Sequence, residues 1–361
     1  MIVSATDLKT LAREILVRAG ATGANANCVA AHLVNSSLCG VDTHGVWQLP
    51  GYVAAIERNE LLPAATPELL NDTPTSVLVT GRWGFGQVAA LEAIQQAVRK
   101  AQSSGVSVVG IVQSHHIGRL GEYVELAARL GFIAMIWTSG LGEEKPTVVP
   151  HGGTKPIFGT NPLAIGLPAA DEHPITVDFA TSATSGVKII EAIRQGNSLA
   201  PGLIVDKHGV ATSDPRDLDH GGGQVSFGGH KGYALTLATE VLGRIFVGAD
   251  TLVEAPRGGY PFSHQGAAMI VIRADMFQPS ESYLERTSEL QRRVRTVPPA
   301  PGFEQVNLPG DPEARMRAIR EREGIPIPDD LWQTLTALAS RRVNSSSSLE
   351  PQLVHHPGRD R

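Results

Sequence analysis

The chain has 361 residues, of which 42% are hydrophobic and 19% charged, and its formal net charge is −5 at pH 7. This composition is that of a soluble globular protein with a large core, and the length is typical of two domains. The acidic balance gives no reason to expect a nucleic acid or an anionic membrane as a partner, and no apolar run approaches the length of a membrane span.

The start of the chain and its two cysteines bear on the cellular compartment. Residues 1–7 contain neither the basic region nor the long apolar region of a signal peptide. Cys28 and Cys39 lie in one helical pattern, and a continuous helix would separate them by roughly 16 Å, too far for a disulfide. We therefore expect a cytoplasmic protein.

The N-terminal region is predicted to be helical. Apolar residues recur with helical spacing over 8–19 and 29–38, and a third helix is expected over 45–59, where Pro50 and Gly51 can kink or delay it. Such a helical unit usually serves in packing or in a subunit contact.

Three polar residues of this region, His44, Gln48 and Tyr52, are spaced by four, so a helix that begins near His44 would carry them on one face. They offer an imidazole that titrates near neutral pH, an amide and a phenol, and Thr43 is placed to orient the imidazole. Taken alone, the segment favours a buried histidine held by a neighbouring hydroxyl; the alternative is the wall of a substrate site.

From about residue 75 the pattern changes to alternating strands and helices, which predicts a layered α/β core. Strands are expected over 76–80, 106–112, 132–138, 163–167, 175–179 and 268–272, and helices over 86–104, 119–130, 233–246, 281–294, 313–323 and 329–340.

The segment Gly84–Ala89 has the spacing Gly-x-Gly-x-x-Ala between a strand and a helix, which is the pattern of a Rossmann phosphate motif. The second strand of a Rossmann unit should end in an acid that holds the ribose, but here it runs into residues 113–116, Gln-Ser-His-His. We interpret the motif as a false match, and a Rossmann domain is the structural alternative.

Residues 113–123 connect a strand to a helix start, where free backbone N–H groups and the helix dipole favour an anion. Two glycines permit close backbone approach, Arg119 adds positive charge, and His116 could donate to a phosphate or reach a carbonyl. Two adjacent histidines, His115 and His116, also suggest a metal site. The chain has no His-Glu-x-x-His motif and no Cys/His cluster, however, so we expect no metal site.

Further loops that are rich in glycine lie at strand and helix ends. Residues 149–153, 159–162 and 178–182 follow or precede expected strands; turn chemistry explains each alone, although such loops commonly carry function. Residues 228–232, Gly-Gly-His-Lys-Gly, precede a helix and form a second anion cradle, without the Gly-Lys-Ser/Thr of a P-loop. The serine-rich segment 344–361 is expected to be a disordered tail.

In this order the motifs resemble the malate/L-lactate dehydrogenase family, which includes ureidoglycolate and sulfolactate dehydrogenases, diketogulonate reductase and the piperideine/pyrroline-2-carboxylate reductases. The resemblance spans about residues 5–340. It rests on Val41-Asp42-Thr43-His44-Gly45-Val46, Ser114-x-His116-x-Gly118-x-x-Gly121-x-Tyr123, Pro150-His151-Gly152-Gly153, Gly159-Thr160-Asn161-Pro162, Asp178-x-Ala180-Thr181-Ser182, Lys231-Gly232 and Leu308-Pro309-Gly310.

The resemblance implies an α/β fold with a mixed (α+β) sheet that binds a nicotinamide cofactor without a Rossmann domain. We expect a helical substrate and dimer domain from residues 1–74, joined by 300–343, and a cofactor-binding domain over 75–299. Members are typically homodimers, in which the helical unit of one subunit helps to close the other's site near the interface.

The activity implied is hydride transfer between NAD or NADP and the C2 carbonyl, or imine, of a 2-oxo acid or close derivative. His44 would be the acid/base, with Thr43 in place of the usual supporting serine, and His116 would stand in the active centre. Substrate contacts would come from Gln48, Tyr52 and Thr160. Cofactor contacts would come from His116, Ile117, Gly118, Arg119, Leu120, Asp178, Phe179, Ala180, Lys231, Gly232, Pro309 and Gly310. The choice between NADH and NADPH stays open, because no 2′-phosphate pocket is identifiable from one sequence.

Two positions depart from the family pattern. Gln48 stands where many members have an arginine that grips the substrate carboxylate, a contact worth about 1.5–3 kcal/mol. Either another cation replaces it, or the substrate is neutral at that point. Lys188 stands where some imine-reducing members place an aspartate. Lys188 weakens the case for a cyclic imine reductase, which stays one alternative; the other is a cofactor-binding paralogue that has lost catalysis.

Overall fold

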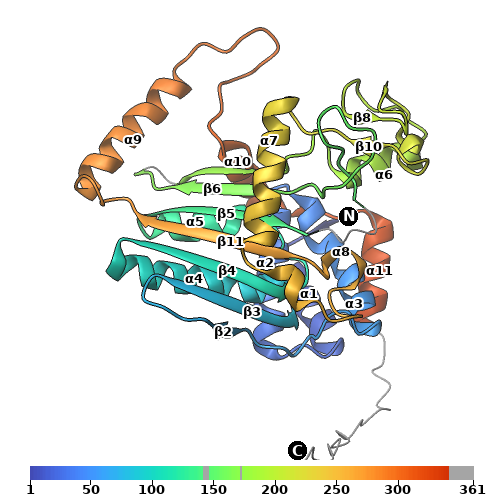
Figure 1. Cartoon of the computed structure of the whole chain (residues 1–361), viewed down its shortest axis with the longest axis horizontal. Coiled ribbons are helices and arrows are strands. Elements are labelled where there is room, and N and C mark those ends of the chain that lie inside the picture. Colours follow the sequence, from blue (N-terminus) through green and yellow to red (C-terminus); the bar gives the residue numbers. More distant parts are fainter. Residues whose placement is uncertain (141–145, 171–172, 341–361) are drawn as a thin grey trace, which may run out of the picture.

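The structure is a computed structural model that describes residues 1–140, 146–170 and 173–340. Its centre is a seven-stranded sheet in the order β2–β3–β4–β11–β5–β6–β7 (Figure 1). The strands are β2 (Glu68–Leu70), β3 (Ser76–Gly84), β4 (Val106–Ser114), β5 (Phe132–Ser139), β6 (Leu163–Leu167), β7 (Ile175–Phe179) and β11 (Gly266–Arg273). Within this sheet β3 and β4 are parallel and every other neighbouring pair is antiparallel.

The mixed sheet confirms the predicted α/β class and rules out the Rossmann alternative. A Rossmann sheet needs consecutive parallel strands, whereas β11, from late in the chain, lies antiparallel between β4 and β5. As a result β3, β4, β5 and β7 run in one direction, and their carboxyl ends lie at one edge of the sheet. The motif at Gly84–Ala89 and the pair His115–His116 both follow strands at this edge.

Helices cover both faces of the sheet (Figure 1). The helices α4 (Gly86–Ser104) and α5 (Gly121–Arg129) share one apolar core with alternate residues of the strands, such as Val109 and Met269. The small alanine side chains on the buried face of α4 let it approach the sheet closely. The other face carries α7 (His230–Glu240), which continues into the π-helical turn Val241–Ile245.

A helical unit lies at the edge where the four strands end (Figure 1). It contains α1 (Ala5–Arg18), α2 (Gly23–Leu38), α3 (Leu49–Glu57) and α11 (Asp329–Ser340), with Ser4 and Thr22 capping the first two. One core cluster joins them and includes Phe85 from the end of β3. The pairing of β1 (Ile2–Val3) with β12 (Ile325–Pro326) fastens the C-terminal helix to the start of the chain. The boundaries at 74/75 and 299/300 stay a prediction, and the tail predicted at 344–361 falls outside the described residues.

The remaining elements form a small lobe and an arm. The lobe holds α6 (Gly186–Gln195) and a three-stranded sheet of β8 (Ile204–Val205), β9 (Ala211–Thr212) and β10 (Gly223–Gln224), whose strands are too short for a periodic sequence signal. The arm holds α9 (Ser280–Arg295) and leads to α10 (Asp311–Glu323); α8 (Gly259–Phe262) precedes β11. No helix in the described part of the chain is both long and apolar enough to cross a membrane.

Candidate active site

The segment that carries His44 differs from the predicted helix. It forms two 3₁₀ turns, Asp42–His44 and Val46–Gln48, and α3 begins only at Leu49, with Pro50 in its first turn. Gly45 between the turns is extended. Beside it, Ser37 Oγ accepts the N–H of Val46 (3.2 Å) and lies 2.1 Å from the point where a Cβ of residue 45 would be. The expectation that one helix begins near His44 and presents His44, Gln48 and Tyr52 on one face is therefore wrong.

His44 and His116 lie together where the helical unit meets the edge of the sheet. The rings of His44 and His116 stack with centroids 5.5 Å apart and planes inclined by 29°, and Thr43 Oγ1 lies 3.0 Å from His44 Nδ1. Burial is the largest cause that lowers the pKa of His44 to about 4, and the nearby His32 and Arg119 contribute to the same lowering. His44 is therefore a neutral imidazole near pH 7, with Nδ1 held by the threonine.

His116 follows the end of β4 and is held by Tyr52. The Tyr52 hydroxyl lies 2.7 Å from His116 Nδ1, and Tyr52 is only 2% exposed. Burial lowers the pKa of His116 well below its usual value, and the neighbouring His44 adds to the lowering, because protonating both rings at once would place like charges together. The structure thus places the hydroxyl of Tyr52, predicted to bind substrate, against the second histidine.

Gln48 and Thr160, the other predicted substrate contacts, are half-buried. Gln48 Nε2 donates to the carbonyl of Thr43 (2.6 Å), so its amide braces the turn that carries His44. Thr160 precedes β6 at the same sheet edge, and its carbonyl accepts from the N–H (2.9 Å) and the hydroxyl (3.0 Å) of Thr181.

The turn after His116, residues 117–120, is held by a histidine that sequence reasoning missed. His32 on α2 is buried; its Nε2 accepts the N–H of Arg119 (2.9 Å), and its Nδ1 lies 3.2 Å from Glu122 Oε2. Gly118 has φ +79°, and a Cβ there would lie 2.2 Å from the same Nε2. His32 gave no local signal in the sequence, because its partners, Arg119 and Glu122, lie much later in the chain.

Arg119 is turned into the protein. Its side chain is 2% exposed, contacts Glu125, and lies 3.8 Å (Nε) from Asp178 Oδ2 and 3.6 Å (Nη1) from Cys39 Sγ. Asp178 also accepts the N–H of Gly121 (2.7 Å); burial raises the pKa of Asp178 to about 6, while Arg119 and that hydrogen bond oppose the rise. The predicted cofactor residues Arg119 and Asp178 therefore meet, and they fix the start of α5.

Four further predicted cofactor residues lie on or beside β7, namely Phe179, Ala180, Pro309 and Gly310. Thr176 donates its N–H to the carbonyl of Pro309 (3.0 Å), which places Gly310, the N-cap of α10, beside the strand. At the far end of β7, the ring of Phe179 meets that of Phe227 edge to face, with centroids 5.3 Å apart. Ala180, which follows, is half-buried.

Phe227 leads into the start of α7. A Cβ on Gly232 would lie 1.7 Å from the Phe227 carbonyl, so only glycine permits this approach. Lys231 is exposed in the first turn of α7, and no side chain among the described residues caps this N-terminus. The loop before α7 thus offers backbone N–H groups and a lysine on the surface.

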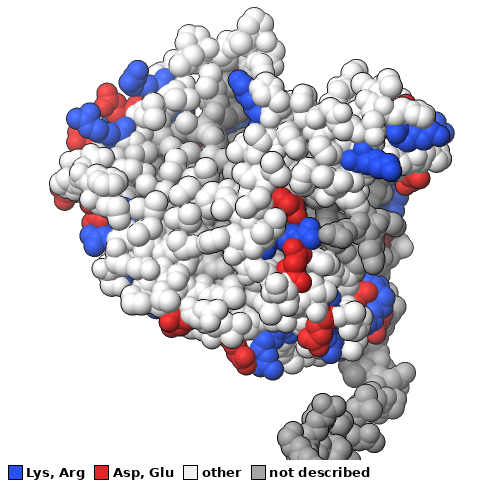
Figure 2. Space-filling model, in the orientation of Figure 1, with Lys and Arg blue, Asp and Glu red and all other residues white. Residues whose placement is uncertain are grey.

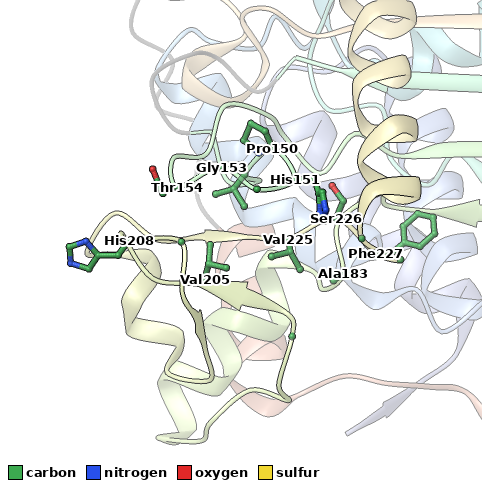
Figure 3. A pocket seen from close by; sticks show the side chains of 16 residues that line it. Pro150, His151, Gly153, Thr154, Ala183, Val205, His208, Val225, Ser226 and Phe227 are labelled. Atoms are coloured by element: carbon green, nitrogen blue, oxygen red, sulfur yellow. The ribbon is translucent and has the colours of Figure 1, made fainter.

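A cavity of about 430 Å³ opens beside this loop (Figure 3). Its lining comes from the 149–154 loop, the small lobe and the loop before α7, and includes Pro150, His151, Val205, Ser226 and Phe227. The cavity adjoins the Lys231 loop, whereas His44 and His116 do not line it.

A model of the malate/L-lactate dehydrogenase family matches residues 3–336. The chain is 33% identical over 336 residues to the Delta(1)-pyrroline-2-carboxylate/Delta(1)-piperideine-2-carboxylate reductase of Pseudomonas putida (92% of this chain, 95% of that protein). It is 33% identical over 343 residues to the L-lactate dehydrogenase of Cupriavidus necator (94% and 97%). The structure of sulfolactate dehydrogenase from Methanocaldococcus jannaschii matches with a TM-score of 0.84 and 31% identity (94% and 96%). With the two histidines stacked at the edge of a mixed sheet, the chain belongs to the malate/L-lactate dehydrogenase family of oxidoreductases.

Proposed function

We propose that this enzyme transfers hydride between a nicotinamide cofactor and the C2 carbonyl of a 2-oxo acid or close derivative, with His44 as the acid/base. The observation that carries the proposal is the stacked pair His44–His116, which joins the helical unit to the edge of the sheet. The turn at 117–120, proposed to bind the cofactor, directly follows the second of these histidines. A proton-transfer group thus lies beside the proposed cofactor site.

The residues present fit a nicotinamide dinucleotide, NAD or NADP, whose phosphates are anionic. The start of α7 offers Lys231 and backbone N–H groups that lack a side-chain cap among the described residues, and the turn at 117–120 leads into the start of α5. Helix N-termini favour anions. When bound, the nicotinamide ring supplies or takes up the hydride.

The chain's own part in the reaction is the proton at the substrate oxygen. Thr43 holds His44 at Nδ1, which leaves Nε2 to take a proton from a C2 hydroxyl during oxidation and to return it during reduction. The low pKa of His44, about 4, makes the neutral, proton-accepting form the resting state. His116, also neutral, is held beside it by Tyr52.

The substrate class follows from Gln48. Its amide braces the Thr43 carbonyl at 2.6 Å, and an amide cannot form the bidentate ion pair of an arginine with a carboxylate. We therefore favour substrates that carry an amide, ester or other neutral group where 2-oxo acids carry a carboxylate.

The two alternatives differ in their support. The similar protein of Pseudomonas putida is a Delta(1)-pyrroline-2-carboxylate/Delta(1)-piperideine-2-carboxylate reductase, which keeps cyclic imines as the second candidate substrate class. Lys188, in place of an aspartate, weakens this candidate; it is exposed in the first turn of α6. A paralogue without catalysis is not favoured, because the relatives are described as dehydrogenases and reductases.

The test is the absorbance of the reduced nicotinamide with NADH and with NADPH, over a panel of 2-oxo acids, their amides and cyclic imines. Turnover of amides above that of the free acids is the expected result. Cofactor binding without turnover of any of these compounds would instead identify a non-catalytic paralogue.

We also propose that the enzyme is a homodimer through the outer face of α7. Leu237, Val241 and Ile245, spaced by four, lie on this face and are exposed, as is Phe246. In Figure 2, charged side chains lie mainly around the rim of the view, with one small cluster nearer its centre. A contiguous exposed apolar stripe is typical of a protein interface. His44 and His116 nevertheless meet within one chain, so their contact needs no second subunit.

The free thiols of Cys28 and Cys39 support the cytoplasm as the compartment.

A further inference from the structure

The segment Gly84–Ala89, which matches a nucleotide-binding motif in its spacing, packs on the backbone of the two histidines that follow β4. The carbonyl of Gly84 accepts the N–H of His115 (3.0 Å). A Cβ on Gly86 would lie 2.1 Å from the carbonyl oxygen of His115 and 2.5 Å from that of His116. Glycine at position 86 therefore lets the start of α4 touch the histidine pair, which brings the next residue, Gln87, to the site.

Gln87 reaches His116 through Tyr52. Gln87 is 1% exposed, and its Nε2 donates to the Tyr52 hydroxyl oxygen at 2.6 Å. The same hydroxyl lies 2.7 Å from His116 Nδ1. An amide nitrogen only donates, so the phenol oxygen accepts from Gln87 and directs its own proton to Nδ1.

The protonation states of the three groups agree with this order. Burial raises the pKa of Tyr52, so the phenol keeps the proton that it donates. Burial also lowers the pKa of His116, so its imidazole is neutral and has one nitrogen with a free lone pair. An accepting Nδ1 requires the ring proton to be on Nε2.

The orientation of the Gln87 amide decides the direction of the chain. Its Oε1 is buried and has no hydrogen-bond partner among the described residues. The flipped amide would instead bury an NH₂ group with two unpaired donors, and buried N–H groups without partners are rarer than under-satisfied carbonyls. The orientation with Nε2 toward Tyr52 is therefore favoured.

We propose that Gln87 is a positioning residue, which acts through Tyr52 to make Nδ1 of His116 an acceptor and to keep the ring proton on Nε2. The catalytic consequence rests on the proposed function. A neutral imidazole with its proton on Nε2 donates a hydrogen bond to a carbonyl or alkoxide oxygen from that atom, whereas the other tautomer presents a lone pair there.

The direct test is the ¹⁵N NMR spectrum of the histidine side chains in the full-length protein, with the His116 signals assigned by their loss in His116→Gln. The wild type should show the Nε2–H tautomer at His116. Gln87→Glu keeps the shape but offers an accepting carboxylate, so Tyr52 should turn its proton away and His116 should shift to Nδ1–H. Gln87→Met removes the donor and should give a mixture of the two tautomers. Gln96→Met, on the same helix and bonded to Glu92, should leave the spectrum of His116 unchanged.

The kinetic arm uses the same variants. The outer hydrogen-bond partners of metal-bound histidines typically contribute about 10–100-fold to activity. By analogy, kcat should fall by about that factor in Gln87→Glu, while KM for the cofactor stays unchanged. An Nδ1–H tautomer in the wild type, or an Nε2–H tautomer that persists in both Gln87 variants, would overturn the proposal. The spectrum needs no turnover, so an inactive wild type with the expected tautomer would contradict the proposed function and leave the role of Gln87 intact.

Discussion

His44 and His116 stack with their ring centroids 5.5 Å apart, although one lies in a 3₁₀ turn of the helical unit and the other after a strand of the sheet. Two imidazolium rings at this distance would repel each other, and both groups have lowered pKa values, for which burial is the largest cause. The pair is therefore stable as two neutral rings, each held at Nδ1 by a hydroxyl group.

Replacing His44 tests the proton-transfer role. His44→Gln keeps a polar side chain of similar reach but cannot take up a proton, so kcat should fall by about 10²–10⁴-fold, the typical contribution of general acid–base catalysis. The measurement is steady-state turnover in the oxidative direction. Thr43→Val removes only the partner of Nδ1 and should lose less. Wild-type turnover in His44→Gln would eliminate the assigned role.

The pH dependence should differ between the two directions. Oxidation needs neutral His44, so its kcat/KM should decline only as pH falls toward the His44 pKa of about 4. Reduction needs the protonated form, so its kcat/KM should fall about tenfold per pH unit above that pKa. The two profiles are measured between about pH 5 and 8 with saturating cofactor. Because this range lies above the His44 pKa of about 4, His44 stays mostly neutral throughout it. A reductive rate that is independent of pH across this range would contradict the assignment.

Gln48→Arg tests the substrate class. A guanidinium at this position restores a charge-assisted grip on a carboxylate, worth about 1.5–3 kcal/mol, which corresponds to roughly 10–150-fold in kcat/KM. The gain should appear with 2-oxo acids and be absent with the matching amides. Gln48→Met, of similar length and without charge, is the control and should bring no gain with either. An equal response of acids and amides to Gln48→Arg would refute the carboxylate argument.

His32→Leu tests the hold on the turn at 117–120. The variant leaves the N–H of Arg119 without its acceptor (2.9 Å in the structure), and an unpaired buried donor costs about 1–3 kcal/mol. Both the free energy of unfolding in urea and the affinity for the nicotinamide cofactor should fall. Asn35→Ala is the matched control, because Asn35 bonds Glu122 (2.8 Å), not the turn; it should leave cofactor affinity unchanged. Unaltered cofactor affinity in His32→Leu would separate this turn from the cofactor site.

Ile245→Glu tests the dimer face. Ile245 is 60% exposed in one chain, so a charge there is tolerated by the monomer but is buried in the proposed interface, where an unpaired charge is strongly unfavourable. Sedimentation velocity should show a dimer for the wild type and a monomer for the variant. Leu130→Glu, at a position that is 58% exposed beyond the end of α5, should remain a dimer. A wild-type monomer would refute the proposal.

The sequence by itself determined the local elements and the family. The apolar pattern predicts α4 with the bounds observed, Gly86–Ser104, because its helical spacing buries one stripe of small apolar side chains against the sheet. The short apolar runs that predict β6 and β7 also have the bounds observed. The order of the motifs, from Thr43-His44 to Pro309-Gly310, is enough to identify the family, since it needs no knowledge of distances.

Only the tertiary structure decided how these pieces meet. Three arrangements join segments far apart in the chain: the position of β11 between β4 and β5, the contact of His116 with Tyr52, and that of His32 with Arg119. Such contacts leave no periodic trace in either segment, because each side chain is set by the surface that the other presents. The same reason explains why Gly84–Ala89 resembles a phosphate loop in spacing and yet lies packed against two histidines.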